Sequence, residues 1–176
     1  MSAPDRLFRI HIQAPIERVW RELTKTDEAQ GAVFNAWLVS TVLGEGAPLQ
    51  MRTGSGKNVI VDGHVLVHKP YTHFAHTHRF TQYDDPLCEV HYLLKETADG
   101  GVELTLRVVG LPEGTPTAKS MASGGDFILK HLKRLAEGQG LPLGTKIMYA
   151  LMGSMEFVLP KRCRTEHWPM KEKDHG

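Results

Sequence analysis

The sequence is poor in cysteine and has no excess of charge of either sign. Only two cysteines, Cys88 and Cys163, occur in 176 residues, which excludes a disulfide framework or a zinc ribbon and favours a reducing, cytoplasmic location. Lysine and arginine number 21, against 20 aspartate and glutamate residues. With this balance no long-range field attracts a polyanion, so we expect no nucleic-acid partner.

Long apolar runs and leader-like segments are also missing. No uninterrupted stretch of about 18 apolar residues occurs, so we expect no transmembrane segment. Residues 1–13 carry charges and lack an apolar run that ends in small residues, so we expect no secretory signal peptide. The composition is 41% hydrophobic and 23% charged, which is typical of a folded domain.

The first part of the chain predicts a strand followed by helices. Residues 7–13 alternate between polar and apolar positions, as a half-buried strand does. Pro15 suits the first turn of a helix, and the sequence up to about Thr24 predicts that helix. Its apolar stripe consists of Ile16, Val19, Trp20 and Leu23. A shorter helical segment is expected over residues 27–34.

The middle of the chain predicts an antiparallel meander with one dry face. Strand patterns and turn residues place strands at 36–43, 48–53, 57–68, 72–82, 88–96 and 102–110. The connections are short, so neighbouring strands pair antiparallel. In the third of these strands Val65 and Val67 share the dry face with Gly63, and this parity places His64 and His68 on the wet face.

A long helix is expected after the meander. Residues 117–137 return to a helical period, with Met121, Ile128, Leu132 and Leu135 along one stripe. The resulting architecture is α+β, with a curved antiparallel sheet wrapped around a long helix. The space between sheet and helix is either filled by side chains or available to a ligand.

The tail adds a strongly amphipathic segment to this domain. We divide the chain into a domain over residues 1–140 and an extension over 141–176, in which residues 145–159 predict a helix. Its apolar side comprises Ile147, Met148, Leu151, Met152, Met155, Val158 and Leu159, and its other side Lys146, Tyr149, Gly153 and Glu156. Full burial of the apolar side would contribute on the order of 10 kcal/mol. The helix is therefore expected to pack on its own domain, with the cavity mouth as a candidate place, against a second copy in a homodimer, or at a membrane interface through the basic residues 161–164.

Several stretches resemble the START-like proteins of the SRPBCC superfamily. Residues 10–24, IHIQAPIERVWRELT, are similar to the strand and helix that open those proteins. Residues 63–70, GHVLVHKP, and 74–80, FAHTHRF, look like the central strand pair of one branch, the homologues of the activator of the 90-kDa heat-shock-protein ATPase. Residues 101–112 and 124–135 extend the likeness, which covers roughly residues 7–138. It implies the helix-grip fold, the architecture described above.

Two positions depart from the pattern of that branch. Its long helix usually carries a tryptophan that plugs the cavity, whereas this chain has Gly125 at that position. The glycine would leave extra volume unless Phe127 turns inward. The strand that usually has aromatic residues at alternate positions has His76 and His78 between two phenylalanines, which predicts a cavity with a polar floor.

The predicted function is the binding of a hydrophobic or amphipathic small molecule, with no cofactor. The expected cavity lining is Trp37, Phe74, His76, His78, Tyr92, Leu104, Gly125, Phe127 and Ile128. His76 and His78 point the same way, as metal ligands do, but a third ligand is missing and no metal is expected. The assignment depends on strand parity, and a slip of one residue would exchange the two faces.

Two other functions stay open. The resemblance implies a chaperone-ATPase activator or a stress-related interaction protein. Members of the superfamily also include cyclases, and in such an enzyme His76, His78 or Asp126 would move a proton. No catalytic residue is assigned, because Cys88 begins an apolar strand, where cysteine acts as a small hydrophobe, and Cys163 lies in a tail expected to be exposed.

Overall fold

Seven strands form a single antiparallel sheet in this computed structural model, which describes residues 4–171. The strands are β1 (Arg6–Ile12), β2 (Trp37–Ser40), β3 (Pro48–Arg52), β4 (Val59–Lys69), β5 (His73–Phe80), β6 (Cys88–Glu96) and β7 (Val102–Val109). Their spatial order is β1-β7-β6-β5-β4-β3-β2. The predicted meander from β2 to β7 is therefore confirmed, and β1 joins the sheet beside β7.

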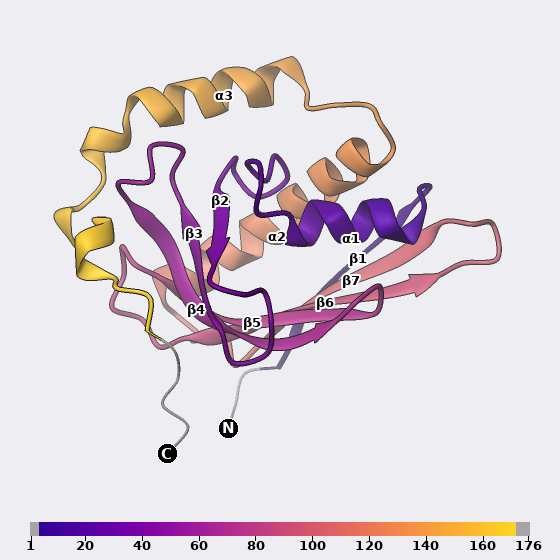
Figure 1. The fold of residues 1–176 in the computed structure, drawn as a ribbon, viewed down its shortest axis with the longest axis horizontal. Coiled ribbons are helices and arrows are strands. Elements are labelled where there is room, and N and C mark those ends of the chain that lie inside the picture. Colours follow the sequence, from indigo (N-terminus) through magenta and orange to yellow (C-terminus); the bar gives the residue numbers. More distant parts are fainter. Residues whose placement is uncertain (1–3, 172–176) are drawn as a thin grey trace.

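Three α-helices accompany the sheet within the described residues. They are α1 (Ile16–Thr24), α2 (Pro116–Ala136) and α3 (Leu143–Ser154). Figure 1 shows α1 and α2 over the inner side of the curved sheet, with α3 spanning the top of the view. The predicted α+β helix-grip architecture is thus confirmed. None of the helices described is both long and apolar enough to cross a lipid bilayer.

The two inner helices form where capping and periodicity favour them. The α1 helix buries its predicted stripe of Ile16, Val19, Trp20 and Leu23. At the start of α2, the Thr115 side chain accepts a hydrogen bond from the Ala118 backbone N–H at 3.2 Å, and Pro116 occupies the first turn. Both features stabilise a helix start. The α2 helix packs against β1 and α1, which fixes it across the inner face of the sheet.

The short helix expected over residues 27–34 is wrong. This segment is a turn closed by a bridge between Gln30 and Ala36. Phe34 and Asn35 have φ values of 51° and 56°, in the left-handed region that a right-handed helix does not visit. The buried Gln30 side chain donates to the Leu23 carbonyl at 3.1 Å. The Gln30 hydrogen bond and the left-handed residues Phe34 and Asn35 shape this turn, and apolar periodicity does not predict either feature.

A β-bulge in β4 changes the face on which its last residues lie. The register with β5 shifts between Val65 and Val67. Beyond the shift His68 pairs with Phe74 on the inner face, and its ring centroid lies 5.5 Å from that of Trp20. The prediction that His68 faces outward is therefore wrong, because a bulge inserts one residue and reverses the alternation.

The chain after α3 packs along the outer face of β3 and β4. It forms short 3-10 helices at Glu156–Val158, Lys161–Cys163 and Thr165–His167. Arg164 forms a bridge with Asn58, and the buried Gln50 side chain donates to the Trp168 carbonyl at 2.8 Å. Cys163 has no exposed surface, so the expectation of an exposed thiol in this tail is wrong. Burial between tail and sheet makes Cys163 a packing residue.

Candidate ligand-binding cavity

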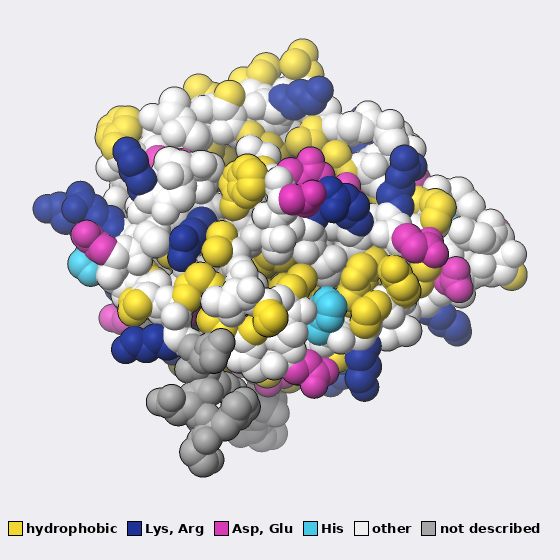
Figure 2. All heavy atoms as spheres, in the orientation of Figure 1, with side chains coloured by type: hydrophobic (Ala, Val, Ile, Leu, Met, Phe, Trp, Pro, Cys, Tyr) yellow, Lys and Arg dark blue, Asp and Glu magenta, His cyan; other side chains and the backbone are white. Residues whose placement is uncertain are grey.

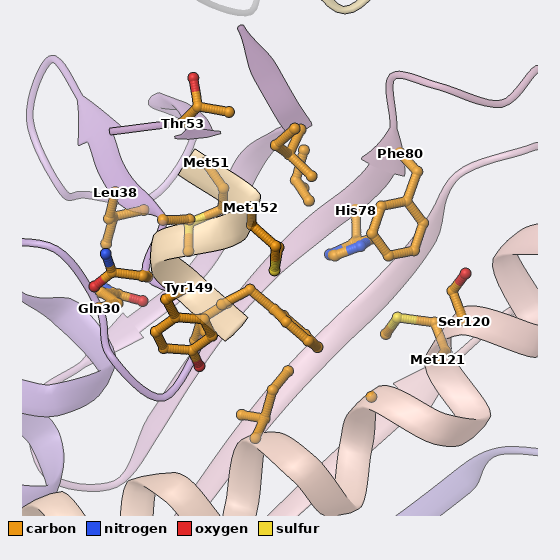
Figure 3. Close-up of a pocket in the computed structure, with 18 of the residues that line it drawn as sticks. Gln30, Leu38, Met51, Thr53, His78, Phe80, Ser120, Met121, Tyr149 and Met152 are labelled. Atoms are coloured by element: carbon orange, nitrogen blue, oxygen red, sulfur yellow. The ribbon is translucent and has the colours of Figure 1, made fainter. Parts of the chain in front are cut away.

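The inner face of the sheet, the first half of α2, and α3 enclose a cavity of about 800 Å³. This volume lies in the range of small-molecule sites. Figure 3 shows the wall from inside, with His78 and Phe80 of β5 opposite Met121 of α2, and Met152 reaching in from α3. Most of the lining side chains are apolar. The cavity is therefore suited to a molecule with a large apolar surface.

Most of the predicted lining residues lie on the cavity wall. They are Phe74, His76, His78, Tyr92, Gly125 and Ile128, which come from β5, β6 and α2. The strands place them together because alternate residues of antiparallel neighbours share one face. That these residues bind a ligand stays a prediction.

Two predicted lining residues, Trp37 and Leu104, do not lie on the cavity wall because of where their strands place them in the sheet. Trp37 begins the edge strand β2 and is 37% exposed, and its neighbour Leu38 faces the cavity instead. This is the one-residue slip that strand parity cannot exclude. Leu104 does face inward, but it is fully buried in the packed core and does not reach the cavity.

The expected role of Phe127 is also wrong. A Cβ atom placed on Gly125 would lie 2.5 Å from the ring of Phe8, so a β1 side chain fills the space beside the glycine. The Phe127 ring does not line the cavity. It stacks instead between Phe34 and His131, at centroid distances of 4.7 and 3.9 Å. The extra volume expected at Gly125 is therefore partly occupied by Phe8.

His78 brings polar atoms without partners to the cavity wall. Its ring lies 5.8 Å from that of His76 and 4.6 Å from that of Phe80, measured between centroids. The residue is partly accessible from the cavity, but its Nδ1 and Nε2 atoms are covered and have no hydrogen-bond partner among the described residues. Burial lowers the pKa of His78 to about 3. Unpaired buried polar atoms are rare in folded proteins, and each calls for an explanation.

His76 is also neutral, but its hydrogen bonding is partly satisfied. Its Nδ1 lies 2.9 Å from the Thr77 carbonyl, so this nitrogen carries the proton and donates it, and Nε2 is left as an acceptor. Burial lowers the pKa of His76 to about 4. Burial also raises the pKa of the neighbouring wall residue Tyr92. His76, His78 and Tyr92 are therefore all uncharged near neutral pH.

The cavity wall has almost no charge. No lysine or arginine is among the described residues that line it, and its one carboxylate is that of Glu156. This carboxylate accepts hydrogen bonds from the Ser55 hydroxyl at 2.5 Å and the Asn58 amide at 3.3 Å. Burial alone would raise the pKa of Glu156, but these hydrogen bonds lower it below its usual value. Glu156 is therefore an anion whose carboxylate already accepts hydrogen bonds from the β3–β4 turn.

Polar contacts attach α3 over the cavity. The Tyr149 hydroxyl donates to the Gly31 carbonyl at 2.8 Å. Near the start of α3, the Thr145 hydroxyl donates to Nε2 of His131 at 2.8 Å, because Nδ1 of that ring donates to a backbone carbonyl. The contact of Glu156 with the β3–β4 turn follows just beyond the end of α3. These three polar contacts hold α3 on its own domain, the first of the three alternatives, and place it over the cavity.

The apolar side of α3 is much less buried than the sequence predicts. Ile147, Leu151 and Met152 line the cavity yet remain 53%, 57% and 45% exposed. The one buried residue of α3 is Tyr149, which the sequence placed on the polar side. Figure 2 shows hydrophobic side chains gathered along the top edge of the molecule, over α3. The expectation of full burial is therefore wrong.

Apart from His76 and His78, the groups considered for catalysis lie away from the cavity wall. Asp126 is exposed on α2 and does not line the cavity, so its suggested role in proton transfer is wrong. Cys88 is buried at the start of β6, and burial raises the pKa of its thiol to about 11. Between residues 4 and 171, no group of three or more His, Cys, Asp or Glu side chains is placed to hold a metal ion.

Methionine is the signal that sequence reasoning missed. Five of the seven methionines in the sequence line the cavity, namely Met51, Met121, Met148, Met152 and Met155. Methionine is unbranched and flexible, and it is common on surfaces that adapt to several partners. Met148, Met152 and Met155 share the apolar side of the tail segment, whereas Met51 on β3 and Met121 on α2 are far from them in the sequence. The sequence shows the methionines of the tail segment as a group, but the convergence of Met51 and Met121 on the same cavity is visible only in the fold.

Comparisons with known proteins agree with the architecture. A family model described as "Activator of Hsp90 ATPase homolog 1-like protein" matches residues 13–137. A search among curated proteins gave no match. Among solved structures, protein MLL2253 from Mesorhizobium loti has a TM-score of 0.64 at 19% identity, over 78% of this chain and 100% of its own.

Two further solved structures show the same likeness. The crystal structure of CalU16 from Micromonospora echinospora has a TM-score of 0.61 at 19% identity, covering 88% of this chain and 87% of its own. The solution structure of the Aha1 dimer from Colwellia psychrerythraea has a TM-score of 0.60 at 18% identity, covering 78% and 98%. At such identities the likeness shows the shared fold alone.

Proposed function

This chain belongs to the Activator of Hsp90 ATPase homolog 1-like family, and we propose that it binds a hydrophobic or amphipathic small molecule in the cavity under α3. The observation that carries the proposal is the cavity of about 800 Å³ with mostly apolar walls. Protein interiors are normally close-packed, and an apolar space of this size is unfavourable unless it is used. The polar attachments of α3 support the proposal further, because a helix held by few buried apolar contacts can move to admit a ligand.

Binding accounts better for the two histidines than catalysis does. A general base works best when its pKa lies near the working pH. Burial holds the pKa of His76 at about 4 and that of His78 at about 3, so both are weak bases. Neutral imidazoles remain good hydrogen-bonding groups, which favours a role in orienting a ligand over one in moving protons as in a cyclase or hydratase.

The first test is occupancy of the cavity. Native mass spectrometry of the purified chain is expected to show added mass of a few hundred daltons, or binding of one equivalent of the neutral dye Nile red. Ile128→Trp, which adds bulk on the α2 wall, is expected to weaken Nile red binding, while the volume-conserving Ile128→Leu is expected to leave it near the wild-type value. Equal affinity in both variants would place the dye outside this cavity and contradict the proposal.

Activation of a chaperone ATPase remains the alternative, and it rests on the family description alone. The test is an ATPase assay with the purified chaperone of the same organism and increasing amounts of this chain. An unchanged rate at saturating chain would remove the alternative without affecting the binding proposal.

We also retain as proposals a homodimer through residues 145–159 and a division of the chain near residue 140. The exposed apolar side chains of Phe157 and Val158, just beyond α3 and outside the cavity lining, support the first, since exposed apolar patches often mark interfaces. The family match, which ends at residue 137, supports the second.

A further inference from the structure

We propose that the cavity selects uncharged ligands, namely long apolar molecules that end in a hydroxyl or carbonyl group, and discriminates against carboxylates and phosphates. This inference rests on the proposed function and specifies its ligand class. It is carried by the charge of the cavity wall and by the unpaired ring nitrogens of His78.

The wall offers an anion no compensating charge. No lysine or arginine is among the described residues that line the cavity, and Glu156 adds a negative charge. A carboxylate moved from water into such surroundings loses its hydration without gaining an ion pair, which is strongly unfavourable. An alcohol or ketone with the same apolar chain loses far less.

The histidines do not supply the missing positive charge. The pKa of His78 is about 3 and that of His76 about 4, in both cases because burial disfavours the imidazolium ion. For a carboxylate to pair with protonated His78 at pH 8, binding would have to raise that pKa by about 5 units, more than a neighbouring charge usually provides. Both rings therefore meet a ligand in the neutral form.

A neutral imidazole is suited to a hydroxyl or carbonyl group. It has one N–H donor and one bare nitrogen acceptor, and in His78 both nitrogens lack partners within residues 4–171. A ligand must displace a covering side chain to reach them. Figure 3 shows Met121 and Met152 on the helix side of the cavity, across from His78, and flexible methionine side chains can repack around a guest.

The experiment compares 1-decanol with decanoate as competitors of Nile red on the full chain at pH 8. The two molecules have the same chain length and differ in the charge of the end group. The alcohol is expected to displace the dye at a concentration at least about tenfold lower than the carboxylate. Equal potency, stronger binding of decanoate, or bound dye that neither molecule displaces would overturn the inference and leave the proposed function standing. Absence of both Nile red binding and any thermal shift with 1-decanol would contradict both.

Substitutions at two wall positions test the two parts of the inference separately. His78→Phe keeps an aromatic ring but removes the hydrogen bond, so Nile red still binds while the advantage of 1-decanol over decanoate shrinks. His64→Phe, on the outer face of β4, is the matched control and keeps the wild-type preference. An unchanged preference in His78→Phe would exclude His78 from ligand recognition.

Met152→Lys introduces a cation on the α3 side, where the residue is partly exposed and a lysine can be accommodated. Relative to Met152→Gln, it is expected to increase the ratio of decanoate affinity to 1-decanol affinity at least about tenfold. Met152→Gln controls for loss of the methionine. If the lysine variant binds decanoate no better than the glutamine variant, the lack of a cation is not what excludes carboxylates.

Discussion

The two ends of the inner sheet face are covered in different ways. At one end α1 and the second half of α2 pack against the sheet, and Val19, Leu104 and Leu132 have no exposed surface. At the other end the first half of α2 and α3 surround a cavity, and Tyr149 is the one buried residue of α3. The first end supplies stability through apolar burial, whereas the second end uses polar contacts to hold a cover in place.

The difference in free energy between these covers is large. The four buried side chains of α1 contribute on the order of 1.5–3 kcal/mol each on burial. Each hydrogen bond that attaches α3 contributes about 1 kcal/mol. Opening of α3 therefore requires much less free energy than separation of α1 from the sheet, so the cover over the cavity can open while the rest of the domain stays folded.

The largest expected effect contrasts a residue of the packed core with a residue of α3, the helix over the cavity. Leu132→Ala in α2 removes a fully buried side chain and is expected to lower the free energy of unfolding by about 3 kcal/mol. Leu151→Ala in α3, where the side chain is 57% exposed, is expected to cost less than about 1 kcal/mol. Urea unfolding of both variants measures the difference. Equal losses would mean that α3 is as firmly packed as the core.

The second prediction concerns acid. The pKa values of His78 and His76 in the folded chain, about 3 and about 4, lie below the ordinary value of 6.5, so the unfolded chain binds more protons below pH 6.5. Stability is therefore complete above that pH and is lost as the pH falls. Each of the two histidines is expected to lower the free energy of unfolding by about 2 kcal/mol as the pH falls from 6.5 to 5.

Urea unfolding at pH 7.5 and pH 5 measures this loss. His78→Phe is expected to show a smaller loss on acidification than the wild-type chain, because one of the two groups is gone. His64→Phe serves as the control from the outer face. A wild-type chain whose stability is the same at both pH values would show that the cavity histidines are hydrated enough to protonate in the folded state.

The third prediction separates the cover from the core. Tyr149→Phe removes the hydroxyl that donates to the Gly31 carbonyl and is expected to lower the free energy of unfolding by only about 1 kcal/mol. Its main effect is expected on kinetics, with faster release of Nile red in stopped-flow displacement. Tyr71→Phe, at an exposed tyrosine beside Trp20, is the control. Equal release rates in the two variants would show that α3 does not control exit from the cavity.

The two regions also differ in how well the sequence predicts them. Alternating apolar positions such as Val102 and Leu104 define one face of a strand, and the stripe of α1 defines one face of a helix, so the filled end follows from periodicity. Tertiary contacts decide several local features that periodicity does not predict. The turn around Gln30, the bulge after Val65 and the position of Phe8 over Gly125 depend on hydrogen bonds and packing between distant residues.

The α3 helix shows most clearly what periodicity cannot predict. Periodicity assigned seven apolar residues of the tail helix to a buried side, but the helix crosses a cavity, where there is little atomic surface to pack against. Tyr149 is buried because its hydroxyl reaches Gly31 across the fold, and no spacing along the helix reveals that partner. Strand alternation predicts His78 as a wall residue, whereas the lack of hydrogen-bond partners for its ring nitrogens is visible only in the folded chain.

The smallest effect on stability is expected next to the end of α3. Phe157, just beyond α3, is 85% exposed, so Phe157→Ser is expected to change the free energy of unfolding of the monomer by less than about 0.5 kcal/mol. If residues 145–159 form a homodimer, the same substitution lowers the dimer fraction, because it removes apolar surface from the interface. Light scattering with size-exclusion chromatography over a range of concentrations measures that fraction, and the unfolding midpoint of a dimer would rise with concentration. A monomeric chain that loses more than about 1 kcal/mol on this substitution would show that Phe157 packs inside the domain, and the contrast between a filled and a loosely covered end would no longer hold at this point.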